Sequence, residues 1–199
     1  AAAPTQTNAG VGDIKFRDVN GDGKITDLDR TYQGVTIPKY SYGVNFSANY
    51  KNWDFAMFWQ GAGGNKVFNS IYRNLMAGQY GNHHTDTLNY WTPTNTNTDV
   101  PRPIIGDPNA NTRDSNRFVQ KGDYLRLQTM EIGYEIPVPA NGVIQRAKLF
   151  VNGQNLWTIT KYTGADPDFN SNDGSFSRGY DNGSFPNPRT VSLGVEVNF

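Results

Sequence analysis

The stretch "KYSYGVNFSANYKNWDFAMFWQG" (residues 39–61) decides the fold of this chain. From residue 40 to residue 50, apolar and polar residues alternate without a break, as they do on a strand whose side chains point to opposite faces. A tight turn at residues 51–52 leads into a second strand, 53–62. The apolar face of that second strand carries Trp53, Phe55, Met57 and Trp59. The stretch therefore predicts a β-hairpin over residues 40–62.

Three more strands are expected further along the chain, at residues 124–136, 147–158 and 189–199. In the last of these, Val191, Leu193, Val195, Val197 and Phe199 share one face. In the strand at 124–136, Leu125 and Leu127 lie out of phase with the apolar residues that follow. That break predicts either a β-bulge or a strand whose upper end leaves a membrane. The pattern as a whole predicts an all-β fold of antiparallel strands.

Short and long connections alternate between these strands. The turns at 51–52 and 137–146 are short, whereas segments 13–39, 63–123 and 159–188 are long. In an up-and-down sheet all short turns then fall on one side, an arrangement typical of outer-membrane barrels with short periplasmic turns and long extracellular loops. Strands of about ten residues match a tilted membrane crossing. Aromatic residues at strand ends fit the interfacial belts of such barrels, namely Tyr40, Tyr50, Trp53, Tyr134 and Trp157.

The long segments are polar and rich in Gly, Asn and Asp, and most of their length is expected to be irregular. A short helix is predicted at 67–78, ended by Gly78. His83 and His84 lack a third metal ligand and are interpreted as exposed loop residues. Asp166 and Asp168 either bind an ion or, as we favour, bond within their loop. Four loop aromatics either stack on sugar rings, contact a partner protein or simply pack in the loops: Trp91, Tyr162, Phe169 and Tyr180.

Composition excludes several classes of function. Lys plus Arg and Asp plus Glu each number 18, so the chain is neutral, which argues against a nucleic-acid surface. The chain has no cysteine, hence no disulfide and no thiolate metal site. It has no apolar run of about 18 residues, the length of a transmembrane helix. The start "AAAPTQTNAG" lacks both an initiator Met and signal-peptide features, which suggests a processed or clipped piece.

The stretch "DVNGDGKITDLDR" (residues 18–30) follows the pattern of a calcium-binding loop. Calcium takes six to eight oxygen ligands, and a sharp turn at position 6 of such loops requires glycine, here Gly23. The expected ligands are Asp18, Asn20, Asp22, Lys24 through its carbonyl, Thr26 directly or through water, and Asp29. Asp29 stands where an EF-hand has a bidentate Glu, and no helix clearly precedes the loop. The alternative is a metal-free turn in which Asp and Asn bond nearby backbone amides. Either way, its role is structural.

Four stretches together resemble the C-terminal part of a SusC/RagA-type TonB-dependent outer-membrane transporter of the Bacteroidota. They are residues 12–30, residues 38–69, "YLRLQTMEIGYEIP" with "LFVNGQNLWTITKYTGADPD" (124–137 and 149–168), and "PRTVSLGVEVNF" (188–199). The resemblance implies a 22-stranded transmembrane up-and-down β-barrel filled by an N-terminal plug domain. Residues 1–199 would supply only its last strands, without the plug. Because an open sheet edge is not tolerated in lipid, the chain is expected to be either a fragment or one part of a nicked barrel.

The resemblance also implies a function and partners. The whole protein would import a bulky nutrient, an oligosaccharide or oligopeptide, across the outer membrane together with a SusD-like lipoprotein. TonB would act through the absent N-terminal part, and the barrel-assembly machinery would read Phe199 as a terminal assembly signal. The remaining barrel, the plug and the lipid bilayer complete the expected partners. Lumen-facing candidates are Asn45, Asn49, Asn152, Gln154 and Glu196.

Two other classes of function stay open at this point. A soluble, secreted, calcium-stabilised β binding module predicts a protein that dissolves without detergent, and the alternating apolar faces count against it. An enzyme requires acids that converge in a cleft, and none stands out, so no catalytic residue is expected.

Overall fold

A computed structural model of the chain describes residues 4–77, 81–139, 141–169 and 178–199. The chain divides into two compact units. The sheet unit comprises residues 35–67, 121–179 and 184–199, and the loop unit comprises residues 1–34, 68–120 and 180–183. Each unit is described by itself below.

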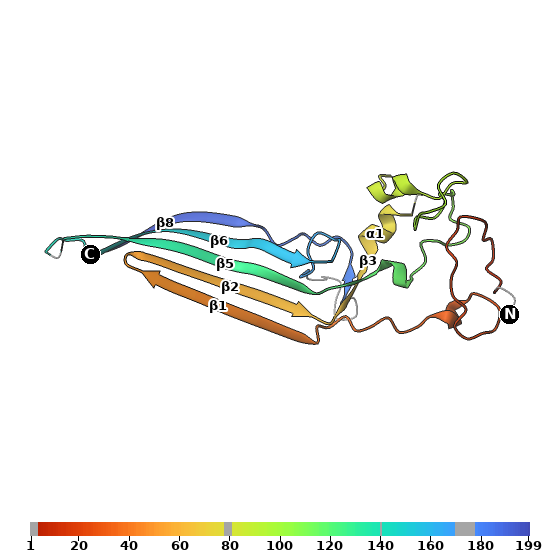
Figure 1. Cartoon of the computed structure of the whole chain (residues 1–199), viewed down its shortest axis with the longest axis horizontal. Coiled ribbons are helices and arrows are strands. Elements are labelled where there is room, and N and C mark those ends of the chain that lie inside the picture. The colour runs from red at the N-terminus through yellow and green to blue at the C-terminus, as the bar shows by residue number, and fades with distance from the viewer. Residues whose placement is uncertain (1–3, 78–80, 140, 170–177) are drawn as a thin grey trace. The chain divides into compact units, whose positions relative to one another are not determined.

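Five antiparallel strands form the sheet unit, in the order β1-β2-β5-β6-β8 (Figure 1). Their bounds are β1 Tyr40–Tyr50, β2 Trp53–Gly63, β5 Tyr124–Ile136, β6 Arg146–Thr160 and β8 Thr190–Asn198. Each of these strands pairs with the one that follows it within the sheet. The all-β, up-and-down arrangement that the alternation predicted is therefore confirmed.

The pairing register places the apolar side chains of all five strands on the same face of the sheet. Val44 lies opposite Trp59, Ile132 lies opposite Val151, and Val151 in turn lies opposite Leu193. Because side chains alternate along each strand, the residues between these positions share the other, polar face. The sheet thus has two chemically distinct sides, and both extend from β1 to β8.

A β-bulge restores the phase of the strand at 124–136. The β5 register shifts between Leu127 and Thr129 against β6, and the matching shift against β2 lies between Phe58 and Trp59. Leu127 consequently faces the same side as Met130, as the bulge interpretation predicted. Against β5, strand β6 has one extra residue at this bulge. The bulged part of β6 includes Asn155, which has a positive φ of 52°. Asparagine is one of the few residues besides glycine that adopts this conformation readily.

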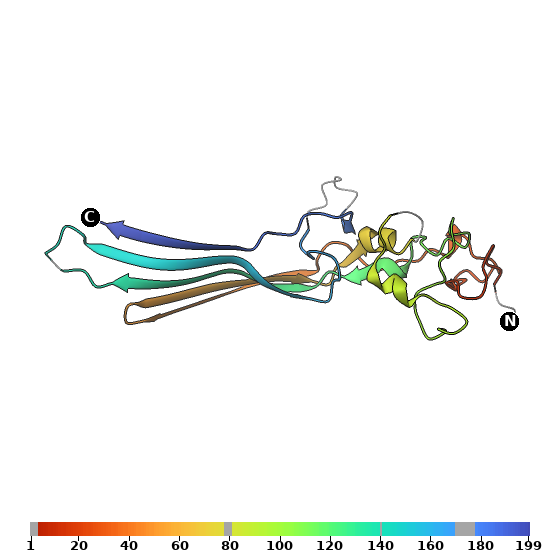
Figure 2. The same ribbon diagram turned by 90° about the horizontal axis from the view of Figure 1, so that it is seen from above.

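The apolar face of the sheet remains open. Val191 and Leu193 are each 72% exposed, and Val44 is 57% exposed. The few large apolar side chains of the sheet unit that are buried lie toward the loop ends of its strands, among them Tyr124 and Tyr162. Figure 2 shows the strands following one another in a single curved layer. The described sheet therefore leaves a broad apolar surface without a protein core against it.

The described parts of the long segments are mostly irregular, as the sequence predicted, but they also contain short strands that were not expected. A small sheet, in the order β4-β3-β7, joins β3 (Lys66–Asn69), β4 (Val119–Lys121) and β7 (Tyr180–Asp181). Helix α1 (Ser70–Leu75) follows β3 and begins at Asn69, whose side chain accepts from the Tyr72 amide. Within the loop unit, Phe68 packs against Phe118 and Tyr180. The helix lies inside the predicted span 67–78, but Gly78 falls outside the described residues.

Candidate functional site

The five lumen-facing candidates share the polar face of the sheet. Asn45 and Asn49 lie opposite Phe58 and Asp54, at positions that alternate with the apolar residues of β1. The strand register places Asn152, Gln154 and Glu196 on the same side of the sheet. Asn152 pairs with Glu131, Gln154 with Thr129 and Glu196 with Lys148. The structure thus brings all five to one surface. Their contact with a lumen stays a prediction.

Charged side chains form two groups of ion pairs on the same polar face. The Lys148 ammonium lies 2.9 Å from Asp54 and 3.0 Å from Glu131. Asn152 donates a hydrogen bond of 3.3 Å to Glu131. In a second group, Arg146 pairs with Glu135 and lies 3.6 Å from Glu196. These groups are partly exposed, so this side of the sheet is suited to contact with water.

At the end of the sheet from which the long segments leave, a buried arginine binds the segment after β6. Arg126 donates to Thr158 at 3.0 Å and pairs with Asp166, and the two charged side chains are 2% and 6% exposed. Asp166 also accepts from the backbone and side-chain nitrogens of Asn187, at 3.0 and 3.1 Å. Burial raises the pKa of Asp166, but hydrogen bonds from Asn187, Asp168 and Arg126 outweigh it, and the pKa lies below its usual value. The sequence indicated bonding within the loop and missed Arg126.

The calcium-type loop is a compact, hydrogen-bonded turn. The two Asp18 oxygens accept from the amides of Gly21 and Gly23 at 2.7 and 2.8 Å. Asp29 reaches back to accept from Val19 at 2.8 Å and from Thr26 at 2.7 Å. The N–H of Thr26, followed by that of Val19, lowers the pKa of Asp29. Asp18 and Asp29, at opposite ends of the motif, therefore hold the same turn together.

The remaining predicted ligands also take part in local bonds. Asn20 accepts from the Asp22 amide at 3.0 Å, Asp22 accepts from the Lys24 amide at 2.8 Å, and Thr26 caps a short turn. Among the described residues, no three His, Cys, Asp or Glu side chains gather as a metal site would require. The described geometry is that of the Asx-rich turn. Calcium binding to this loop stays a prediction.

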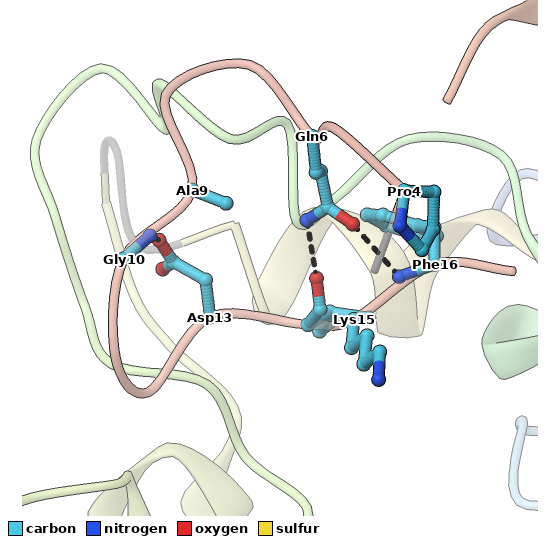
Figure 3. A pocket seen from close by; sticks show the side chains of 8 residues that line it. Pro4, Gln6, Ala9, Gly10, Asp13, Lys15 and Phe16 are labelled. Atoms are coloured by element: carbon cyan, nitrogen blue, oxygen red, sulfur yellow. Dashed lines mark hydrogen bonds between the residues drawn. The ribbon is translucent and has the colours of Figure 1, made fainter. Parts of the chain in front are cut away.

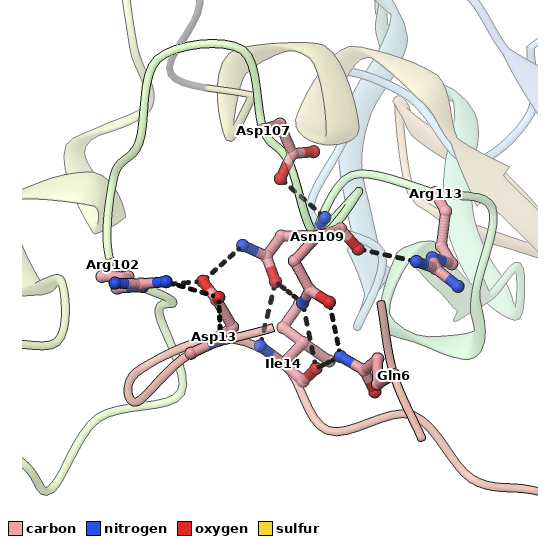
Figure 4. Close-up of polar contacts among 9 residues, drawn as sticks. Gln6, Asp13, Ile14, Arg102, Asp107, Asn109 and Arg113 are labelled. Carbon is pink, nitrogen blue, oxygen red and sulfur yellow. Dashed lines mark hydrogen bonds and ion pairs between the residues drawn. The ribbon is translucent and has the colours of Figure 1, made fainter. Parts of the chain in front are cut away.

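A buried polar network in the loop unit was not predicted from the sequence (Figure 4). Arg102 donates two hydrogen bonds to Asp13, at 2.8 and 3.0 Å, and the Asp13 side chain is only 2% exposed. Asn111 donates a third at 3.1 Å. These donors, Arg102 foremost, lower the pKa of Asp13 to about 2. The network joins two segments almost a hundred residues apart, which no local motif could reveal.

Gln6 extends this network beside a small hollow of about 290 Å³ (Figure 3). Its side-chain nitrogen donates to the Ile14 carbonyl and to Asn109, both at 2.6 Å, while its oxygen accepts from Phe16 at 2.9 Å. Both ends of the Gln6 amide are therefore satisfied by the protein itself. We interpret this part of the loop unit as structural rather than as a binding site.

The other loop residues singled out in the sequence have ordinary packing partners. His84 accepts from the Asp86 amide at 3.2 Å, and its ring lies against Tyr72. Tyr162 stacks on Phe169 with ring centroids 6.4 Å apart. Trp91 lies over Gly12, where an added Cβ would collide with the indole. Trp91, Tyr162, Phe169 and Tyr180 therefore contribute to packing within their own units.

Phe199 follows β8 and is 76% exposed. It continues the phase of Val195 and Val197, on the apolar face. Its role as an assembly signal stays a prediction. None of the helices in the described part of the chain has the length and apolar character needed to span a membrane.

Comparisons with known proteins relate this chain to receptors and transporters. No protein-family model matches it. TonB-dependent receptor P3 of Formosa agariphila is 38% identical over 191 residues, covering 92% of this chain and 19% of that receptor. TonB-dependent receptor SusC of Bacteroides thetaiotaomicron is 24% identical over 189 residues, covering 92% of this chain and 17% of that receptor.

A solved structure of the RagAB peptide importer in its closed–closed state matches the fold with a TM-score of 0.74 at 22% identity. The match covers 92% of this chain and 20% of that chain. This chain spans about a fifth of the length of the relatives it matches. With the strand order and register described above, these matches assign the chain to the SusC/RagA family of TonB-dependent receptors, as a segment of the barrel.

Proposed function

We propose that this chain forms part of the wall of an outer-membrane transporter that imports a bulky nutrient, an oligosaccharide or an oligopeptide. A SusD-like lipoprotein covers the barrel from outside, and TonB acts on it from inside through the N-terminal part. The remaining strands of the barrel pair with β1 and β8, and the plug fills the lumen. The names of the relatives, TonB-dependent receptors and a peptide importer, support this proposal.

The observation that carries the proposal is the two-sided sheet. In water, each exposed Val or Leu of the apolar face forgoes roughly 1.5–3 kcal/mol of burial free energy. Val191, Leu193 and Val195 alone are 63–72% exposed, on a continuous surface that soluble monomers rarely tolerate. Lipid removes this cost without a second protein layer. The polar face, with its Lys148 and Arg146 networks, requires water or polar cargo instead.

On this proposal, the five lumen candidates act as a hydrogen-bonding wall. Asn45, Asn49, Asn152 and Gln154 offer amide donors and acceptors, and Glu196 offers a carboxylate. Import changes which side of the membrane can reach the cargo, and it makes or breaks no bond in the cargo. The chain therefore needs polar lining and shape, not a nucleophile or a general base.

Neighbouring residues on β8 provide a matched test of the two faces. Ser192 and Leu193 point to opposite sides of the sheet, and the chain has no cysteine of its own. The experiment places Ser192→Cys or Leu193→Cys in the full-length protein in its native membrane and measures labelling by a charged, water-soluble thiol reagent. We expect the Ser192→Cys variant to react at least tenfold faster. Equal rates at both positions would contradict the proposed orientation.

The state of the protein on extraction tests the assembly. Native mass spectrometry of the detergent extract should find this chain in a large complex with the plug-bearing part of the transporter and a surface lipoprotein. A folded β-protein that leaves the membrane fraction without detergent would instead support the soluble binding module. A complex that contains the plug-bearing part but no lipoprotein would support the transporter proposal and contradict the proposed SusD-like partner.

A further inference from the structure

The row of paired residues nearest the short turns is aromatic on three neighbouring strands. Tyr50 lies opposite Trp53, and Trp53 lies opposite Tyr134. Tyr50 and Trp53 are 71% and 53% exposed, and the ring centroids of Trp53 and Tyr134 are 4.9 Å apart. Figure 1 shows the turn between β1 and β2 at the same end of the sheet as the connection between β5 and β6. On the proposed placement in the membrane, such a row marks the boundary between hydrocarbon and lipid headgroups.

Lys51, the first residue of the turn between β1 and β2, has a backbone conformation that lysine rarely adopts. Its φ is +54°. Glycine and asparagine are the usual residues at such positions of two-residue hairpin turns, because a longer side chain crowds the backbone there. The turn alone therefore gives no reason for a lysine. Strained positions of this kind often mark a function.

The charge of Lys51 is not neutralised within the described part of the chain, where its ammonium forms no ion pair. Asp54 and Glu135 are the acidic residues nearest the short turns on β2 and β5. Both belong to the polar face, where Asp54 pairs with Lys148 and Glu135 pairs with Arg146. Lys51 is therefore an exposed cation that is available to an anion from outside the described residues.

A contact with Tyr50 holds this cation on the apolar side of the sheet. The Lys51 ammonium lies 5.4 Å from the centre of the Tyr50 ring, within the range of a cation–π interaction. The ring covers one side of the ammonium, which has three N–H donors in all. A cation placed directly beyond an interfacial aromatic row complements the phosphate of a lipid headgroup.

We propose that Lys51, Tyr50 and Trp53 bind the headgroup of an anionic phospholipid. The ammonium pairs with the phosphate, and the Tyr50 hydroxyl and the Trp53 indole N–H offer further donors to its oxygens. The acyl chains of this lipid cover the apolar residues of β1 and β2. Such a site fixes the depth at which the β1–β2 hairpin lies in the membrane. The inference rests on the proposed function, because it requires the apolar face to lie in lipid.

The test reconstitutes the full-length transporter into phosphatidylcholine vesicles that contain a small share of photoreactive phosphatidylglycerol, an anionic phospholipid. After irradiation, mass spectrometry measures the yield of lipid crosslinked to residues 48–55. We expect unlabelled phosphatidylglycerol to compete for this position, and water-soluble glycerol phosphate at the same concentration not to compete. Competition by glycerol phosphate would overturn a lipid as the source of the phosphate.

Lys51→Gln should lower the crosslinking yield about fivefold, the factor expected for one cation near an anionic lipid surface. Lys51→Arg keeps the charge and should keep the wild-type yield. Lys161→Gln is the matched control, because it removes an exposed lysine that directly follows the other end of β6. An unchanged yield in Lys51→Gln, or an equal loss in Lys161→Gln, overturns the site.

Lys51→Gly separates lipid binding from folding. Glycine adopts a positive φ without strain, so the melting temperature in detergent without phospholipid should stay the same or rise. The crosslinking yield should still fall as it does in Lys51→Gln. A lower melting temperature would assign Lys51 to the fold and overturn the proposal. Failure of the transporter proposal shows separately, as a protein that leaves the membrane fraction without detergent.

Discussion

Arg126 on β5 and Asp166 in the segment after β6 form an ion pair in which both side chains are almost completely buried. The two residues are 40 positions apart in the chain. Asp168, which also approaches Arg126, does so at 3.5 Å with a side chain that is 44% exposed. One arginine therefore has a buried and a half-exposed carboxylate partner, and these two are expected to differ greatly in their contribution to stability.

Asp166→Ala should loosen the segment that follows β6. Removing the buried partner costs up to roughly 3–5 kcal/mol, because Arg126 then keeps only the more distant and half-exposed Asp168. Trypsin cleavage after Lys161, Arg178 or Arg189 of the membrane-embedded protein measures the effect. Asp168→Ala is the control, expected to change cleavage little because that partner is exposed. Equal cleavage of the two variants would contradict the assigned role of Asp166.

The two faces of β8 predict opposite tolerance to charge. Leu193→Arg should destabilise the barrel by roughly 2–4 kcal/mol, the cost of arginine on a lipid face near the midplane. Ser192→Arg, one position away on the polar face, should be accepted. The fraction of protein that keeps its compact, heat-sensitive mobility on gels reports assembly. Full assembly of Leu193→Arg would argue that lipid does not cover this face.

The Asp13–Arg102 pair makes the loop unit sensitive to acid. The pKa of Asp13 falls from an ordinary 3.8 to about 2 in the folded state. Because the pKa of Asp13 is lower in the folded state than in the unfolded state, its carboxylate stabilises the fold at pH values above the unfolded pKa. This stabilisation is lost as the pH falls from about 4 to about 2. Pepsin, which is active in this range, should cleave the wild type increasingly toward pH 2. Asp13→Asn should already be cleaved at pH 4, and pH-independent resistance in both proteins would count against this account.

Calcium binding to the 18–29 loop predicts a ligand-dependent gain in stability. Free calcium at about 100 times its dissociation constant should add about 2.7 kcal/mol. Trypsin protection at Lys24 and Arg30, with calcium or with a chelator, measures the gain. Asp18→Asn combined with Asp22→Asn removes two charges and keeps one acceptor oxygen at each position, so protection by calcium should disappear. Identical cleavage of wild type under both conditions would favour the metal-free turn.

Asn155 tests the bulge in β6. The positive φ suits Asn and Gly, whereas a β-branched residue there should cost about 1–3 kcal/mol. Asn155→Gly and Asn155→Val both lose the 3.0 Å hydrogen bond to the Pro188 carbonyl, so the difference between them isolates backbone strain. Urea unfolding of the reconstituted barrel measures that difference. Matching midpoints would mean that the bulge can relax.

Sequence alone was sufficient for the five strands of the large sheet and their two faces, because the alternation of apolar and polar residues is local and recurs along each of these strands. It also indicated the bulge, since Leu125 and Leu127 break phase with Met130. It missed contacts made between distant segments. Nothing near Arg126 points to Asp166, and nothing near Asp13 points to Arg102. The side-chain oxygen of Asn65, which is buried without a hydrogen-bond partner among the described residues, was hidden for the same reason, because a missing partner shows only when the neighbours are in place.

Short turns and long connecting segments alternate between the strands, and this arrangement affects the order in which the strands are expected to fold. β1 and β2 are joined by two residues, whereas β2 and β5 are separated by residues 64–123. Hairpins close in microseconds, and contacts between distant segments form more slowly because loop closure comes first. The two hairpins, β1–β2 and β5–β6, are therefore expected to form as independent pieces. Their union, and then the addition of β8, would follow as later steps that a kinetic experiment can resolve.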